Sequence, residues 1–199
     1  MTAALALSLM SVPAMALTAS ESAVVDRAED WFNSVSTLSA DFVQTGQTGE
    51  RTSGHMLLKR PGLIRFDYAP PAQVLLISNG TFVTFVDYEV GQETSWPLFD
   101  TPLSYLVRES VDLERDALVD EVETADNQTS FRLRAPDNPE QGSITLYFRD
   151  APFRLDGWSV TDAQGQRTTV ALFDTVTNET LPAGSFLYDK PVESWKGNR

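Results

Sequence analysis

The chain has 199 residues and a formal net charge of −13, and it contains one histidine and no cysteine. We therefore expect neither disulfides, nor thiolate metal sites, nor a lipid anchor on an N-terminal cysteine. The acidic balance disfavours nucleic acid and anionic lipid surfaces as partners, because both attract basic side chains.

The N-terminal 16 residues are predicted to be a signal peptide. They contain no charged side chain, and an apolar run is followed by an Ala-Met-Ala triplet that ends at Ala16. Such a small-x-small triplet is typical of a signal peptidase site. The apolar run is shorter than the about 20 residues that a membrane-spanning helix needs. The expected organisation is a signal peptide over residues 1–16 and a single exported domain over residues 17–199.

The mature chain is predicted to begin with an amphipathic helix. From Ser22 to Val35 the apolar residues recur at three- and four-residue intervals, and Ser20 or Ser22 is in position to cap the first turn. The apolar positions are Val24, Val25, Ala28, Trp31, Phe32 and Val35.

Five strands are predicted to follow, and the cation Arg60 lies at the corner between the second and third, just before an apolar face. Arg60 lies in a Lys-Arg-Pro-Gly corner, just before a strand in which Ile64, Phe66 and Tyr68 share one face. An Asn-Gly turn at Asn79 closes the last hairpin. An apolar sheet face with one placed cation is more typical of a site for an amphipathic ligand than of a catalytic site. The strands are expected at 38–47, 52–59, 62–68, 73–78 and 81–87.

A second helix and six further strands complete the predicted fold. Thr101 and Pro102 form a typical helix start, with Leu103, Leu106 and Val107 on one side. The remaining strands are expected at 117–124, 128–134, 142–149, 153–162, 166–174 and 185–189.

These elements predict a mainly β fold with helices (α+β), built on one large antiparallel sheet. A sheet of about ten strands must curl, close or stack to protect its edges. If it curls into an unclosed β-barrel, its inner face becomes an apolar cavity and the amphipathic helices become a lid. The alternative is a filled barrel or sandwich in which the same aromatic residues form an ordinary core, and the strand pattern alone favours this alternative.

The sequence lacks recognisable catalytic and cofactor motifs. It has no Gly-x-Ser-x-Gly elbow, phosphate-binding loop or dinucleotide fingerprint. Because His55 is the only histidine, a histidine-rich metal site cannot form, and a Ser-His-Asp triad would have to use this residue. We therefore predict neither an enzyme nor a bound metal or cofactor. A secreted hydrolase that uses His55 and an acidic pair is the alternative from a different functional class.

Four segments follow one another in an order and spacing that together are specific. The most specific of the four is LKRPGLIRF at 58–66, which is followed by a proline loop and Ser-Asn-Gly. The other three are LSADFVQ at 38–44, DAQGQRT at 162–168, and Phe186 with Pro191 near the end. With these segments, nearly the whole mature chain resembles the LolA-like family of periplasmic outer-membrane lipoprotein carriers.

The resemblance implies an unclosed β-barrel covered by helices, with an apolar cavity for the acyl chains of lipoproteins. Such a monomeric carrier takes its cargo from an ATP-driven extraction complex in the inner membrane. It crosses the periplasm and passes the cargo to an outer-membrane receptor. A carrier of another lipid or hydrophobic ligand on the same fold is the nearest alternative.

The resemblance also implies roles for individual residues. Arg60 matches the arginine that holds the family's helical lid shut and releases it on loading. Thr84 and Ser104 are polar where the family has aromatic or larger apolar residues, which bears on the size of the cavity. The facing of Phe82 and Phe85 depends on strand register. The residues expected to line the acyl-chain cavity are Phe42, Leu58, Ile64, Phe66, Phe82, Phe85, Leu103 and Leu106.

Overall fold

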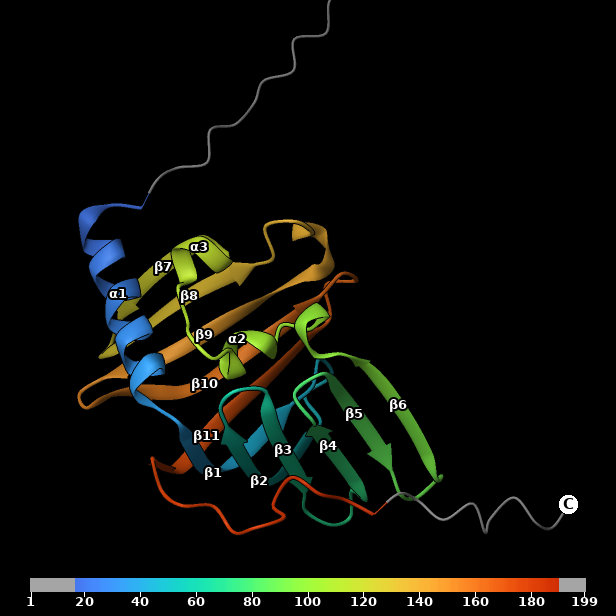
Figure 1. The fold of residues 1–199 in the computed structure, drawn as a ribbon. Helices are drawn as coiled ribbons and strands as arrows, with labels where there is room; N and C mark the ends of the chain where they lie inside the picture. The colour runs from blue at the N-terminus through green and yellow to red at the C-terminus, as the bar shows by residue number, and fades with distance from the viewer. Residues whose placement is uncertain (1–16, 190–199) are drawn as a thin grey trace, which may run out of the picture.

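The computed structural model of the protein describes residues 17–189 (Figure 1). The predicted signal peptide, residues 1–16, lies outside the described residues. Most of the chain forms one antiparallel sheet of eleven strands. These are β1 (Thr37–Thr45), β2 (Arg51–Lys59), β3 (Leu63–Tyr68), β4 (Val74–Ser78), β5 (Phe82–Asp87), β6 (Gln92–Pro97), β7 (Leu118–Ala125), β8 (Gln128–Arg134), β9 (Gly142–Asp150), β10 (Phe153–Asp162) and β11 (Arg167–Thr177).

Helices are short apart from the first. None of the helices within residues 17–189 has both the length and the apolar character needed to cross a membrane. They are α1 (Ala19–Ser34), α2 (Ser104–Val107) and α3 (Leu113–Asp116), together with the 3₁₀ turns η1 (Leu98–Asp100) and η2 (Pro139–Gln141).

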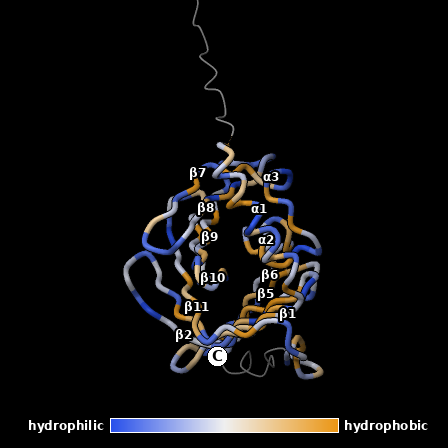
Figure 2. The backbone as a smooth tube through the Cα atoms, turned by 90° about the vertical axis from the view of Figure 1, so that its left-hand side faces the viewer, coloured by the Kyte–Doolittle hydropathy of each residue, from blue (hydrophilic) through white to orange (hydrophobic). Residues whose placement is uncertain are grey.

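The sheet brings its first and last strands together at the centre. β1 pairs with β2 on one side and with β11 on the other, and the spatial order is β6-β5-β4-β3-β2-β1-β11-β10-β9-β8-β7. Among the described strands, β6 and β7 are the two edges, and the sheet is not closed between them. Seen end-on, the sheet curves round and the helices lie between its two arms (Figure 2). The predicted curled, unclosed antiparallel sheet is therefore confirmed.

Two parts of the strand prediction are wrong. The stretch 185–189 contains turns and coil instead of a strand, and Tyr188 packs on the outer face of the sheet against Leu75, Ile77 and Val86. Strand β6 was not predicted, because its sequence QETSWP does not alternate and most of its residues are exposed at a sheet edge. The other predicted strands are confirmed to within a few residues at each end.

Helix α1 begins earlier than predicted, and its cap is Thr18 instead of Ser20 or Ser22. The Thr18 hydroxyl accepts a hydrogen bond from the Glu21 amide at 3.3 Å, and the Glu21 carboxylate accepts one from the Thr18 amide at 2.7 Å. This reciprocal pair is a capping box, which satisfies two backbone donors that the first turn would otherwise leave free.

The second predicted helix is confirmed in place but is shorter than its start signal suggests. Helix α2 begins at Ser104 without a side-chain cap. The hydroxyl of Thr101, the predicted cap, instead donates to the carbonyl oxygen of Leu98 at 2.7 Å. The chain therefore turns twice, in η1 and α2, across the end of the sheet.

The helices pack against the inner face of the sheet, which we define as the face that α1 covers. Val25, Ala28 and Phe32 of α1 are buried in one cluster with side chains from both arms of the sheet. The ring of Phe32 lies edge to face with that of Phe148 on β9, with the centroids 5.6 Å apart. The interior is thus filled, as the alternative prediction has it, but part of the filling comes from the helices that cover it.

Candidate functional site

The site begins at the corner between β2 and β3, where the chain passes from Lys59 to Gly62. Gly62 has φ +79°, and a Cβ atom there would lie 2.7 Å from the Cα of Gly80. Glycine is therefore required, because any side chain would meet both strain and a backbone clash. The Gly62 amide donates to the carbonyl oxygen of Val107 at 2.8 Å, which ties this corner to the end of α2.

Arg60 extends from this corner between two helices. Its Nε donates to the carbonyl oxygen of Leu106 on α2 at 3.2 Å, and its Nη1 donates to the carbonyl oxygen of Phe32 on α1. The guanidinium also lies 5.1 Å from the centroid of the Phe32 ring. One side chain of the sheet thus contacts the backbone of both helices that cover it.

The charge of Arg60 is retained although the side chain is largely enclosed. Burial lowers the pKa of the Arg60 guanidinium to about 10, which leaves it protonated at neutral pH. A buried charge is tolerated only when hydrogen bonds replace the lost water, and the two carbonyl oxygens and the Phe32 ring supply these contacts. Any movement that separates the helices from the corner exchanges these contacts for water.

A second set of hydrogen bonds joins α1 to the segment after α2. The side chain of Asn33 donates to the carbonyl oxygen of Val111 and accepts from its amide, both at 2.9 Å. Glu29 accepts from the amide of Leu113 at 2.5 Å. Burial raises the pKa of the Glu29 carboxyl, which is also repelled by the nearby Asp112. These contacts make α1 and residues 101–117 one connected cover, which we call the lid.

The structure brings most of the predicted cavity residues to one place. Phe42, Leu58, Ile64, Phe66 and Leu106 are all buried in the inner-face cluster. Phe42 and Phe66 meet edge to face, with ring centroids 5.2 Å apart. Leu103 is half-buried and packs against this cluster. Phe85 is also half-buried but does not belong to the cluster.

Phe82 is a correction to the predicted set. In the β4–β5 pairing Ser78 faces Val83 and Leu76 faces Phe85, so Val83 and Phe85 point inward. Phe82 therefore lies on the outer face, where it is 45% exposed. The same register places Thr84 on the outer face, so this departure from the family pattern has no bearing on the cavity.

Several residues of the inner face were not predicted. They are signalled in the sequence only by strand alternation, which does not separate a ligand-contacting side chain from a core one.

A narrow cavity under the lid, of about 10 Å³, is large enough for at most one water molecule. It is lined by Trp31, Phe32, Val35, Leu38, Met56, Leu58, Arg60, Leu106, Leu155, Trp158 and Leu172. The lid is thus closed, and its own side chains occupy the space beneath it.

His55 takes part in a hydrogen-bonded row on the outer face. Its Nε2 lies 3.0 Å from the hydroxyl of Ser39, and its Nδ1 lies 2.8 Å from the carboxylate of Asp41. The order of groups is that of a hydrolytic triad, but the side chains of His55 on β2 and Asp41 on β1 are 49% and 62% exposed. Hydrolytic sites of this kind depend on preorganised donors and exclusion of water, which an open sheet face does not provide. Within residues 17–189, acidic and histidine side chains form no cluster of three or more suited to a metal ion.

Comparison with known proteins gives consistent results. Residues 33–189 match the model of the family described as outer membrane lipoprotein carrier protein LolA. An outer-membrane lipoprotein carrier protein from Pseudomonas paraeruginosa is 31% identical over 182 residues, covering 87% of this chain and 86% of that protein. The corresponding protein from Chromohalobacter salexigens is 30% identical over 198 residues, covering 94% and 92%.

A solved structure supports the fold independently of sequence. The crystal structure of a DUF1329 family protein from Desulfovibrio piger matches 84% of this chain and 97% of its own, with a TM-score of 0.51 at 10% identity. At this identity the likeness concerns the fold alone. The family model and the sequence relatives lead to one conclusion: the chain belongs to the LolA family of outer-membrane lipoprotein carrier proteins.

Proposed function

We propose that the protein carries acylated lipoproteins across the periplasm, with their acyl chains held between the inner face of the sheet and the lid. It takes cargo from an ATP-driven extraction complex in the inner membrane and delivers it to an outer-membrane receptor. It acts as a monomer after removal of residues 1–16. Membership of the carrier family supports this proposal. A carrier binds its cargo without converting it, so the protein is not an enzyme.

The observation that carries the proposal is the pair of hydrogen bonds from Arg60 to the carbonyl oxygens of Phe32 and Leu106. Polar contacts of this kind contribute only about 1.5 to 3 kcal/mol each when they involve a charged donor, because water replaces them when they break. They therefore suit a cover that has to open. An ordinary core held by apolar packing would lose far more on opening.

The need for a carrier follows from the cost of exposing acyl chains. Each buried CH₂ group is worth about 0.8 kcal/mol, so the long chains of a lipoprotein cannot cross an aqueous compartment unprotected. The same argument limits the carrier, because its cavity at best approaches what the membrane supplies. Loading therefore needs outside work, and delivery needs a receptor that binds the chains more favourably.

The closed lid supplies a reason for release. Acyl chains cannot enter a cavity of about 10 Å³, so loading must displace the side chain of Leu106 on α2. A closed-state preference of a few kcal/mol then subtracts directly from the affinity for cargo. We propose Arg60 as the switch of this lid. The acyl-contacting residues are proposed to be Phe42, Leu58, Ile64, Phe66, Phe85, Leu103 and Leu106.

The function is tested by isolating the mature protein from periplasm and identifying bound material by mass spectrometry. We expect triacylated lipoproteins, whose recovery is lost when their acyl groups are removed. The variant Arg60→Leu should retain more cargo than the wild type, because the closed lid no longer competes with it. Recovery of a different lipid would replace the proposed cargo. Failure of both proteins to retain any acylated molecule would contradict the carrier function.

A further inference from the structure

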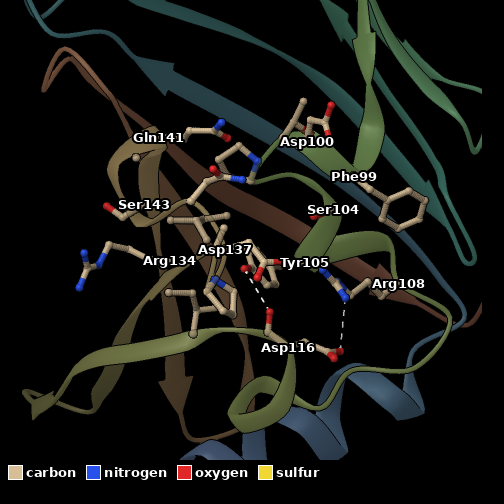
Figure 3. A pocket seen from close by; sticks show the side chains of 18 of the residues that line it. Phe99, Asp100, Ser104, Tyr105, Arg108, Asp116, Arg134, Asp137, Gln141 and Ser143 are labelled. Carbon is tan, nitrogen blue, oxygen red and sulfur yellow. Dashed lines mark hydrogen bonds and ion pairs between the residues drawn. The ribbon is translucent and has the colours of Figure 1, made fainter. Parts of the chain in front are cut away.

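A second and larger pocket lies at one end of the open barrel, on the other side of α2 from the closed cavity (Figure 3). Its volume is about 500 Å³, within the range of small-ligand sites. One wall is the segment 99–105, which includes the end of η1 and the start of α2. The opposite wall is the end of β8, the loop 135–141 and the start of β9.

The floor of this pocket is continuous with the interior of the barrel. Leu133 and Ile144 line the pocket and are also fully buried members of the inner-face cluster. Helix α2 separates the two spaces, because Ser104 and Tyr105 line the pocket whereas Leu106 lines the cavity under the lid. Opening of the lid at α2 would therefore join the pocket to the acyl-chain site.

The rim of the pocket is polar and carries both signs of charge. Three arginines, each with a carboxylate partner, are balanced by three aspartates. Arg115 lies 2.9 Å from both Asp112 and Asp116, and Arg134 donates to Asp120 at 2.8 Å. The lining aspartates are Asp100, Asp116 and Asp137.

Arg108 differs from the other two arginines of the rim. Its Nη1 lies 3.4 Å from Asp116, and its guanidinium lies 5.2 Å from the centroid of the Tyr105 ring. Within residues 17–189, its Nε is the one buried side-chain nitrogen or oxygen that lacks a hydrogen-bond acceptor. A buried donor without an acceptor is unfavourable, and a ligand oxygen that reaches the Arg108 Nε when α2 moves would satisfy it.

We propose that this pocket binds the polar head of an acylated polypeptide, namely the ester and amide carbonyl groups where acyl chains join the first residues of the protein. The inference rests on the proposed function and deepens it. Carbonyl oxygens accept hydrogen bonds without bringing a full negative charge. A phosphate headgroup would bring such a charge close to the three aspartates of the rim, so the neutral carbonyl groups of a lipopeptide fit the charge balance better.

The arrangement gives the carrier a means of selecting its cargo. The apolar interior can accept any acyl chain of suitable length, since burial of CH₂ groups is not specific. The polar pocket distinguishes molecules by what the chains are attached to. Arg108 is assigned as the residue that contacts this attachment region, and Gln141 lies exposed in the loop on the opposite wall.

The test compares three probes with the same acyl length: a synthetic triacylated lipopeptide, palmitate, and lysophosphatidylglycerol. We expect Arg108→Gln to weaken lipopeptide binding about tenfold or more while changing palmitate binding less than twofold. Arg149→Gln is the matched control, since Arg149 is a half-exposed arginine paired with Asp156 at 2.9 Å outside the pocket. Gln141→Trp, which fills the pocket from an exposed position, should show the same selective loss without disturbing the core.

The outcomes separate this inference from the proposed function. If the wild type does not bind the lipopeptide, the carrier function fails and this inference fails with it. If the wild type binds but both variants bind the lipopeptide equally well, only the pocket assignment is overturned. If the two variants weaken binding of the lysophospholipid as much as binding of the lipopeptide, the assignment to a polypeptide head would be overturned. Thermal unfolding of each variant shows whether a loss of binding comes from misfolding. If Arg108→Gln is misfolded, the binding result for Gln141→Trp tests the pocket assignment.

Discussion

Helix α1 contacts the two arms of the sheet in different ways. Toward β9, Trp31 and Phe32 both lie edge to face on the ring of Phe148, with centroid distances of 5.5 and 5.6 Å. Toward the corner between β2 and β3, the directional contact is the hydrogen bond from Arg60 to the carbonyl oxygen of Phe32. One side of the helix is thus held by aromatic packing, and the other by a polar contact at a chain corner.

The difference indicates which side of the lid opens. Buried aromatic rings lose their contribution when water reaches them, and each ring buries about 150 to 250 Å². A hydrogen bond to a carbonyl oxygen is replaced by water at small net cost. We therefore expect α1 to stay with β9 and to separate from the β2–β3 corner when cargo enters. The following changes test the two sides, from the largest expected effect to the smallest.

Phe148→Ala should have the largest effect on stability, because it removes the aromatic side of the comparison. Phe148 is fully buried, and truncation of such a residue costs about 3 to 5 kcal/mol. Urea denaturation measures the loss. Phe148→Leu, which preserves most of the volume, should cost about 1.5 kcal/mol or less. A loss below about 1 kcal/mol for the alanine variant would mean that this ring does not anchor α1.

Arg60→Leu should act on the lid more than on overall stability. Loss of its contacts to Phe32 and Leu106 removes about 3 kcal/mol or more from the closed state, so cargo should bind about a hundredfold more tightly and leave more slowly. Lipopeptide binding and hydrogen exchange at the α2 amides measure this change. Arg65→Leu is the control, because Arg65 pairs with Asp67 at 2.6 Å on the outer face. Unchanged loading and release in Arg60→Leu would rule out the switch role.

Asn33→Ala should loosen the connection within the lid. It leaves the amide and carbonyl of Val111 without their side-chain partner and should cost about 1 to 2 kcal/mol. Faster hydrogen exchange at Val111 would report it, with Asp30→Ala as an exposed control on the same helix. If Asn33 and Arg60 stabilise independent contacts of the lid, the free-energy effects of their substitutions should add in the double variant. A large interaction energy between the two changes would contradict this division.

Glu29→Gln should have the smallest effect on stability. Unlike the other changes, it should stabilise the fold at neutral pH. Burial raises the pKa of Glu29 above 4.5, so the folded state binds its proton more tightly, and ionisation weakens the fold as pH rises. The variant retains an acceptor for the amide of Leu113 and should be more stable at pH 7, by less than about 1 kcal/mol because solvent screens this carboxylate. Denaturation at pH 5 and pH 7 should show a smaller difference than in the wild type. Glu123→Gln, at an exposed position on β7, should leave that difference unchanged.

The regular parts of the fold were predictable because alternation and turn residues are local signals. The hairpin at Asn79 is an example: its side-chain oxygen accepts from the amides of Thr81 and Phe82 at 3.0 and 2.9 Å, which fixes the turn within four residues. Strand β6 was missed because an exposed edge strand needs no apolar alternation. The stretch 185–189 looked like a strand because its apolar residues pack on the outer face without pairing.

The candidate site was predictable only in part, and the limit is again physical. The corner and the inward parity of Ile64 and Phe66 can be read from neighbouring residues. Phe82 and Phe85 are three residues apart in one strand and therefore lie on opposite faces, and only the register of β5 decides which of them points inward. The acceptors of Arg60 are backbone carbonyl groups on distant helices, so no side-chain type in the sequence predicts them. Arg108 gave no signal either, because its environment is assembled from three separate segments.

The central position of β1 beside β11 has a consequence for how the protein folds. Phe42 pairs across this junction with Leu172, whereas every other pairing in the sheet joins strands that are consecutive in the chain. Local hairpins form quickly, but a junction between remote segments must first overcome a large loop-closure entropy. Two meanders, β1–β6 and β7–β11, are therefore expected to form before they join. A chain shortened before β11 would keep two sheets with uncovered apolar faces. We therefore expect it to aggregate and not to remain a folded carrier with weaker binding.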